Sequence, residues 1–202
     1  MNILHIDCSP RIPSYSRRLS AAVLDRIVAA HPQACVVRRD LGLNPLPHAD
    51  TDYAETLGSP AALAACAGSK AVELSEHLIQ ELEASDVLLI GTPMHNFTVP
   101  STLKSWIDQI LRMGRSLTTT STGEKTGLLA DRPVYLAIAS GGIFSGERAK
   151  QPDFLTSYLT AALGCIGLKN LQLLSLQGTA FLDAEQLAGQ QEAQLSSLLL
   201  PE

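Results

Sequence analysis

Apolar runs of strand length recur along this chain, and segments with helical periodicity separate them. Five such runs lie at 2–7, 34–39, 86–91, 133–140 and 171–177. Several are nearly continuous in Val, Ile and Leu, which is typical of strands buried on both faces of a parallel sheet. The alternation therefore predicts an α/β fold, in which a doubly wound parallel sheet carries helices on both faces through right-handed crossovers.

The segments between these runs carry apolar stripes at helical spacing. The stripes are Leu19, Val23 and Ile27; Leu74, Leu78 and Leu82; and Leu103, Trp106, Ile107, Ile110 and Leu111. The third predicts a helix that ends at Gly114, because glycine favours helix C-termini. Trp106 is accordingly expected in the core or at a subunit interface. Residues 152–166 and 184–199 supply two further helices.

Length and composition indicate a single domain over residues 1–202, since a chain with 46% hydrophobic residues can build a full core. Two irregular stretches interrupt the alternation. One short helix is expected within 41–68, and the polar, β-branched residues of 115–130 predict a hairpin. Long loops in a compact α/β domain are usually functional, so both excursions are candidates for building a site.

Composition also excludes several classes of partner. A formal net charge of -5 without a basic stripe argues against nucleic acid. No run approaches the ~18 apolar residues that span a bilayer, and the chain begins with a strand rather than a leader, so a cytoplasmic protein with no membrane partner is expected. No C-x-x-C spacing links the cysteines Cys8, Cys35, Cys66 and Cys165. His5, Asp7 and Asp108 lack ordered ligand spacing, so no metal is expected.

The stretch "DCSPRIPSYS", residues 7–16, joins the first strand to the first helix. Ser9, Ser14, Tyr15 and Ser16 offer hydroxyl donors at the carboxyl edge of the sheet, where a helix N-terminus favours a bound phosphate. Arg11, Arg17 and Arg18 add positive charge nearby. The alternative is that the serines only cap the helix.

Motifs that compete with this phosphate cradle fail on spacing. The loop contains no glycine, so neither G-x-G-x-x-G nor a P-loop is present. A cysteine phosphatase needs Cys-x5-Arg, and the position required for arginine holds Ser14. Cys8 is therefore expected to be a packed residue at the strand end rather than a nucleophile.

Two more loops are expected at the same edge. The third strand leads into Met94, His95, Asn96 and Phe97, which offer backbone polar groups and a flat side chain. The fourth strand ends in Ala139, Ser140, Gly141 and Gly142, where glycine lets backbone approach a ligand, although a tight turn would also explain the pair. A polar loop for phosphate and two loops for a planar ring together point to flavin mononucleotide (FMN).

These loop motifs, taken in order, carry a family resemblance. The motifs are "SPRIPSYSRRLS", "RDLGLNPLPHAD", "PMHNFTVPSTLKSWID", and "SGGI" followed by "YLTAALGCIGL". The chain resembles, almost end to end, the FMN-dependent NAD(P)H azoreductase and quinone oxidoreductase family, whose members are flavodoxin-like homodimers. The resemblance implies a flavodoxin-like five-stranded sheet of order 2-1-3-4-5, bound FMN and a homodimer.

Carried over by position, the family's FMN contacts fall on residues of all three loops. The phosphate contacts are Ser9, Ser14, Tyr15 and Ser16. The contacts to the isoalloxazine ring are Met94, His95, Asn96 and Phe97 on one side and Ala139, Ser140, Gly141 and Gly142 on the other. The chain departs from the family in a phosphate loop one residue shorter, in His95 where relatives have Tyr or Trp, and in Leu117 and Thr119 where relatives often have aromatics. A wider substrate pocket that stacks large dyes less well is expected.

The resemblance also implies a reaction. Two electrons pass from NAD(P)H through FMN to a quinone or azo compound, by a ping-pong mechanism in which the cofactor carries the hard chemistry. His95 is the candidate proton donor, and the alternative is that it only lines the pocket. The rival function is a flavodoxin-type electron carrier, which would not need the excursions at 41–68 and 115–130. A hydrolase is disfavoured because its nucleophile motifs are absent.

Overall fold

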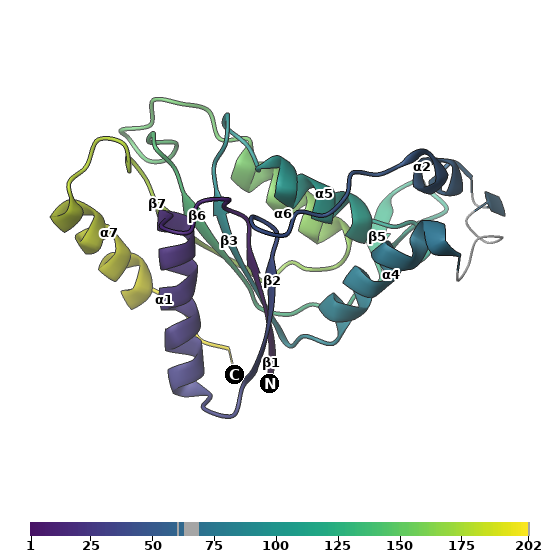
Figure 1. The fold of residues 1–202 in the computed structure, drawn as a ribbon, viewed down its shortest axis with the longest axis horizontal. Helices are drawn as coiled ribbons and strands as arrows, with labels where there is room; N and C mark the ends of the chain where they lie inside the picture. Colours follow the sequence, from purple (N-terminus) through teal and green to yellow (C-terminus); the bar gives the residue numbers. More distant parts are fainter. Residues whose placement is uncertain (60, 63–68, 202) are drawn as a thin grey trace.

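A five-stranded parallel sheet forms the centre of the computed structural model, which describes residues 1–59, 61–62 and 69–201 (Figure 1). The strands are β1 (Asn2–Asp7), β2 (Cys35–Asp40), β3 (Val87–Pro93), β6 (Val134–Ala139) and β7 (Leu171–Leu176). Their order is β2-β1-β3-β6-β7, with every neighbouring pair parallel. Because β4 and β5 form a separate hairpin, this is the expected order 2-1-3-4-5, and that prediction is confirmed.

Helices cover both faces of the sheet (Figure 1). Helices α1 (Tyr15–Ala30) and α7 (Ala184–Ser196) lie on one face, and α4 (Lys70–Glu83), α5 (Ser101–Ile110) and α6 (Leu155–Cys165) on the other. Alternate residues of β1 show why both faces are apolar: Ile3 packs towards α1, whereas Leu4 and Ile6 pack into the larger core under α4 and α5. Among the described residues, no helix combines the length and the hydropathy needed to cross a bilayer.

Helix α5 ends earlier than its apolar stripe indicates. Its last residue is Ile110, so the expected end at Gly114 is wrong. The Ser116 hydroxyl donates to the Ile110 carbonyl and accepts from the Arg112 amide, which satisfies the helix end from beyond it. Gly114 lies instead in the following turn, with φ of +75°. Trp106 is fully buried in the core.

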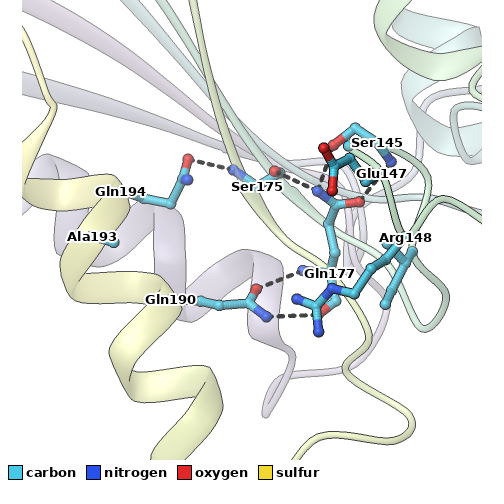
Figure 2. A pocket seen from close by; sticks show the side chains of 10 residues that line it. Ser145, Glu147, Arg148, Ser175, Gln177, Gln190, Ala193 and Gln194 are labelled. Carbon is cyan, nitrogen blue, oxygen red and sulfur yellow. Dashed lines mark hydrogen bonds between the residues drawn. The ribbon is translucent and has the colours of Figure 1, made fainter.

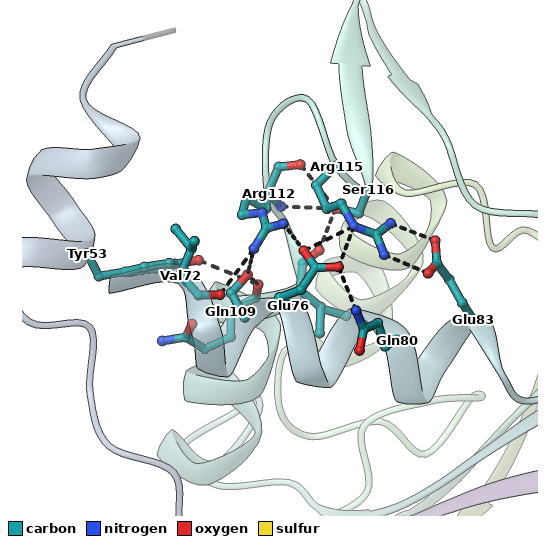
Figure 3. A network of polar contacts seen from close by, with 11 residues as sticks. Tyr53, Val72, Glu76, Gln80, Glu83, Gln109, Arg112, Arg115 and Ser116 are labelled. Carbon is teal, nitrogen blue, oxygen red and sulfur yellow. Dashed lines mark hydrogen bonds and ion pairs between the residues drawn. The ribbon is translucent and has the colours of Figure 1, made fainter. Parts of the chain in front are cut away.

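The two excursions contain the expected elements. Helix α2 (Thr51–Leu57) is the short helix within 41–68, of which residues 60 and 63–68 lie outside the described part. Strands β4 (Leu117–Thr119) and β5 (Lys125–Gly127) pair antiparallel, so the hairpin is confirmed. At its base, Arg112 and Arg115 both bind Glu76 of α4, and Arg115 also contacts both Glu83 oxygens at 2.6 Å (Figure 3). This ion-pair network fixes the hairpin to α4.

Strand β7 is at the edge of the sheet, and glutamines of α7 cover its free backbone (Figure 2). Gln194 Oε1 accepts from the Ser175 amide at 3.0 Å. Gln190 Oε1 accepts from the Gln177 amide at 3.1 Å, and its Nε2 donates to the Gln177 carbonyl at 3.2 Å. Four residues of helix and two of strand span similar distances, so the two glutamines match successive strand amides. The side chains therefore block strand addition at this edge.

Gln190→Ala should lower the stability of the protein and expose this edge. Two hydrogen bonds are lost, so we expect a decrease of about 1–2 kcal/mol in the free energy of unfolding. The corresponding decrease in melting temperature is roughly 2–8 °C for a domain of this size, and calorimetry would measure it. Gln191→Ala is the matched control, because the Gln191 amide makes no hydrogen bond within the described residues. Equal melting temperatures for the two variants would contradict the role given to Gln190.

Candidate functional site

The structure brings the three predicted loops together at the carboxyl edge of β1, β3 and β6, which are neighbours in the sheet. Two hydrogen bonds join the loops. Thr102 at the start of α5 donates from Oγ1 to the Cys8 carbonyl at 3.1 Å, and the Met94 amide donates to the Ala139 carbonyl at 2.8 Å. Residues that are far apart in the sequence therefore meet at one edge of the sheet, as expected for a doubly wound sheet.

The loop between β1 and α1 is shaped by its serines. Ser14 is the N-cap of α1, and its Oγ accepts from the Arg17 amide at 3.4 Å. Ser9 is buried and accepts from the Arg11 amide at 3.2 Å, while Ser16 is fully buried and lies 3.4 Å from the Ser14 hydroxyl. The capping interpretation is thus confirmed for Ser14. It leaves the phosphate interpretation open, because a hydroxyl that accepts a hydrogen bond still has a proton to donate.

Arg17 has a different role from the one its charge indicates. Its guanidinium donates to both oxygens of Asp40, at 2.7 and 2.6 Å, and to the Ser9 carbonyl at 2.6 Å. Hydrogen bonds from Arg17 hold the pKa of Asp40 below its ordinary value. The Arg17 side chain is therefore committed to protein partners, and it holds the loop against the end of β2. Arg11 and Arg18 stay exposed.

Cys8 is fully buried at the end of β1. Burial raises the pKa of its thiol well above the ordinary value, and the Asp7 carboxylate adds to this effect. A nucleophilic cysteine needs the opposite, an electropositive setting that favours the thiolate. The expectation that Cys8 is a packed residue at the strand end is confirmed.

The loop after β3 is a tight turn with unusual backbone geometry. The His95 amide donates to the Thr98 carbonyl at 2.9 Å, and the Thr98 amide donates back at 3.0 Å. Asn96 and Phe97, the two central residues, have φ of +47° and +73°. Asparagine tolerates this region, but a bulky aromatic residue there is strained. The Phe97 ring is also 45% exposed, so the fold holds a strained backbone in order to present an aromatic ring at the site.

The loop after β6 contains a residue that the sequence analysis missed. Gln151 donates from Nε2 to Ser140 Oγ and to Met94 Sδ, both at 3.1 Å. A Cβ added at Gly142 would lie 2.1 Å from Gln151 Oε1, whereas one at Gly141 would meet only Ala180 Cβ, at 3.6 Å. The absence of a side chain at Gly142 therefore makes room for Gln151, and Gly141 is the residue whose backbone stays open.

Other predicted positions separate in the structure. Leu117 packs in the core and Thr119 is exposed. Of the two positions where relatives often have aromatic residues, only position 119 can therefore change the surface of the protein.

The described residues contain no group of three metal-ligating side chains. A cavity of about 470 Å³ lies beside the predicted site, between the loop after β6 and α7 (Figure 2). Among its lining residues are Ile143, Arg148, Gln177, Gln190 and Gln194.

Within β1, before the loop at 9–14, His5 is buried against charged groups. Its Nδ1 accepts from Arg38 at 2.9 Å, and its Nε2 lies 3.7 Å from Asp7 Oδ2. Burial lowers the pKa of the His5 ring, and Arg38 and Arg17 lower it further, against the opposing Asp7 and Asp40 carboxylates. His5 is therefore held neutral.

Stability should fall as pH drops below the ordinary histidine pKa near 6.5. In that window the unfolded chain protonates His5 and the folded protein does not, so the slope of unfolding free energy against pH is positive, at most about 1.4 kcal/mol per pH unit. Urea unfolding at pH 7.5, 6.5 and 5.5 would measure it. His5→Gln removes the titrating group and should flatten this part of the curve. An unchanged slope in that variant would assign the effect to other groups.

Comparison with known proteins gives the family. A family model described as flavodoxin-like fold matches residues 1–199. The chain belongs to this flavodoxin-like family. Within it, the chain is 46% identical over 201 residues to FMN-dependent NADH:quinone oxidoreductase 4 of Pseudomonas fluorescens, covering 99% of this chain and 95% of that protein. It is also 46% identical to FMN-dependent NADH:quinone oxidoreductase 5 of Burkholderia lata, over 91% of this chain and 88% of that one.

Solved structures of the same flavodoxin-like fold agree. An azoreductase from Bacillus anthracis str. Sterne superposes with a TM-score of 0.83 at 26% identity, over 97% of this chain and 98% of that one. An FMN-dependent NADH-azoreductase from Bacillus anthracis str. Ames Ancestor, solved in complex with FMN, superposes with a TM-score of 0.76 at 23% identity, over 96% of this chain and 98% of that one. At this identity the likeness is evidence for the fold only. The resemblance seen in the loop motifs is confirmed.

Proposed function

We propose that this protein is an FMN-dependent NADH:quinone oxidoreductase that also reduces azo compounds. The observation that carries the proposal is the 46% identity, across 99% of the chain, to a protein of that activity. The edge formed by the loops after β1, β3 and β6 supports it independently, because it combines a helix N-terminus, hydroxyl donors and an exposed aromatic ring. Those groups suit a phosphate joined to a planar ring.

We assign each part of FMN to one or more loops of a single domain that spans residues 1–202. The phosphate of FMN is assigned to Ser9, Ser14, Tyr15 and Ser16. Free amides in the first turn of α1 and the positive end of its dipole support a negative group there. The isoalloxazine ring is assigned to Met94, His95, Asn96, Phe97, Ala139, Ser140, Gly141 and Gly142. Gly141 fits this role because open space beside its Cα lets backbone come close.

The chain's own contribution to the reaction is placement and electrostatics. FMN, when bound, supplies the transfer of two electrons from NADH or NADPH to the acceptor. The tight turn at 95–98 holds the backbone of Phe97 in one conformation, which supports a stacking role for its ring. Backbone amides of the loop after β6 would stabilise negative charge. Ping-pong kinetics would follow if donor and acceptor bind in turn at the same surface of the site.

His95 is the proposed proton donor to the reduced acceptor. Its backbone is fixed by the turn and its side chain is exposed at the site. His95→Gln should lower quinone turnover by about tenfold or more, since a positioned acid contributes at least this much. Full quinone turnover in His95→Gln would leave His95 as a residue that only lines the pocket.

A homodimer is part of the proposal. Large apolar side chains are exposed around the site: Ile12 at 71%, Phe154 at 59% and Phe97 at 45%. The Phe154 amide donates to the Phe97 carbonyl at 3.0 Å, so the two exposed phenylalanines lie on adjacent backbone segments. Exposed aromatic clusters of this kind favour association. Sedimentation velocity should therefore give twice the mass of the chain. We also propose that the protein is cytoplasmic.

The visible absorbance of the purified protein tests the function in one cuvette. We expect flavin bands that bleach with NADH and return when a soluble quinone is added. Flavin that NADH and NADPH cannot bleach would favour the electron carrier instead. A colourless protein that takes up no added FMN would overturn the cofactor assignment and leave the loop at 9–16 to another anion.

A further inference from the structure

We propose that Gln151 is a positioning residue of this site, a clamp that fixes the loops after β3 and β6 before the cofactor binds. The inference rests on the proposed FMN-dependent function and adds a residue to it. One amide group makes the contact: Nε2 of Gln151 donates to Ser140 Oγ and Met94 Sδ, both at 3.1 Å. Met94 follows β3 and Ser140 follows β6, so a single side chain joins the two loops assigned to the isoalloxazine ring.

The segment that carries Gln151 is anchored on its N-terminal side. The Lys150 amide donates to the Ile143 carbonyl at 2.9 Å, which closes the loop into a compact unit. Gln177, at the end of β7, accepts from the amides of Phe144 and Ser145 at 2.8 and 2.9 Å (Figure 2). The base of the loop on the N-terminal side of Gln151 is therefore attached to the sheet by protein contacts.

The segment is anchored on its C-terminal side as well. Asp153 accepts from the amides of Leu155 and Thr156, at 3.0 and 2.9 Å, at the start of α6. Pro152 fixes its own φ between this cap and Gln151. A side chain held between two anchored points loses less conformational freedom when it forms hydrogen bonds, so its two contacts are stronger constraints than those of a surface glutamine.

Gly142 gives the clamp its space. Gln151 Oε1 occupies the volume where a Cβ at position 142 would lie, 2.1 Å away. The φ of Gly142 is not positive, so alanine is compatible with the backbone there. Alanine at 142 would therefore push the amide of Gln151 away from Ser140 and Met94 while leaving residue 151 unchanged. This gives a second, independent way to release the clamp.

The role of Gln151 is to preorganise the site. The Met94 amide already donates to the Ala139 carbonyl at 2.8 Å, and the clamp adds side-chain contacts beside that backbone link. With both loops fixed, cofactor binding does not need to order them, and affinity rises through the smaller ordering cost. Gln151 Oε1 makes no hydrogen bond within the described residues, so it stays available as an acceptor at the same surface.

Hydrogen exchange on the full chain without added FMN gives the first test. Gln151→Ala should accelerate exchange of the Met94 amide, and Gly142→Ala should do the same. Lys150→Ala is the matched control, because Lys150 is the exposed neighbour in the same loop and its backbone hydrogen bond is kept. The double variant Gly142→Ala/Gln151→Ala should exchange no faster than Gln151→Ala alone, because both substitutions remove the same contact. Exchange equal to that of the Lys150→Ala control, or additive effects, would overturn the clamp.

Titration with FMN, followed by quenching of flavin fluorescence, gives the second test. Gln151→Ala should raise the Kd by about tenfold, the scale expected for one lost ordering contact, and should shift the bound flavin spectrum. A variant with the wild-type Kd and spectrum would overturn the positioning role. Wild-type protein that takes up no FMN would instead remove the proposed function, and the exchange result would still decide whether Gln151 joins the two loops.

Discussion

Arg17→Ala should cost the protein about 2–4 kcal/mol of its free energy of unfolding, because the change leaves a partly buried carboxylate without its partner. The Arg17 side chain is 13% exposed and that of Asp40 27%, and two hydrogen bonds of 2.6 and 2.7 Å join them. The Ser9 carbonyl loses its guanidinium donor at the same time. We therefore expect the loop at 9–14 to loosen and the affinity for FMN to fall by at least tenfold.

Two matched variants separate this effect from a general loss of charge. Arg26→Ala removes a surface pair in which Arg26 and Glu192 are 50% and 66% exposed, and it should cost less than about 1 kcal/mol. Arg17→Lys keeps the charge but loses the two-pronged geometry, so it should recover only part of the stability. Urea unfolding and FMN titration measure both quantities. A cost for Arg17→Ala no larger than that for Arg26→Ala would show that the contact is not structural.

The same pair gives an acid limit with a definite sign. The pKa of Asp40 is lowered in the folded protein, chiefly by hydrogen bonds from Arg17. Its contribution is therefore complete above the ordinary value of 3.8 and is lost as the pH falls through the lower folded value. This window is separate from that of His5, which lies below 6.5. Arg17→Ala should remove the contribution of Asp40 to this acid window, and it should also reduce the His5 slope, because Arg17 helps to lower the pKa of His5.

Local sequence patterns were sufficient for the elements and for the meeting of three loops. Apolar runs indicate burial on both faces of the sheet. Parallel strands have their carboxyl ends at one edge, so the loops that follow them can be expected to meet there. The hairpin at 115–130 followed from composition for a similar reason, since β-branched residues around a polar turn favour paired strands.

Side-chain contacts between distant segments could not be predicted in this way. From the sequence, Arg17 was expected to be a free positive charge, because its partner Asp40 lies 23 residues away in the chain. Helix α5 ends early because Ser116 reaches back to Ile110, and a helical stripe carries no record of that contact. Gln151 belongs to no sequence motif, and only its contacts with Ser140 and Met94 and the space at Gly142 connect it with the site.

Phe97→Gly should leave the protein as stable as before or more stable, and yet lower its quinone turnover by about tenfold or more. Phe97 has φ of +73°, a conformation that costs a non-glycine residue roughly 1–3 kcal/mol, and glycine adopts it without strain. The greater chain entropy of glycine offsets about 0.5–1 kcal/mol of that gain. Phe97 is 45% exposed, so removal of the ring forfeits about half of the burial energy of a phenylalanine, roughly 1 kcal/mol, which the remaining strain relief can offset. The proposed stacking surface for the flavin is lost.

Opposite changes in stability and activity are what distinguish a strained functional residue from an ordinary turn residue. Phe97→Val should lower the free energy of unfolding, because a β-branched side chain is least tolerated at positive φ. Phe181→Gly is the control for removing an exposed ring without relief of strain, since Phe181 is 81% exposed and its φ is not positive. It should be slightly destabilised and retain its turnover. If Phe97→Gly unfolds more easily than wild type, the turn at 95–98 is stabilised by the ring itself. Strain held for function would then be the wrong account of this loop.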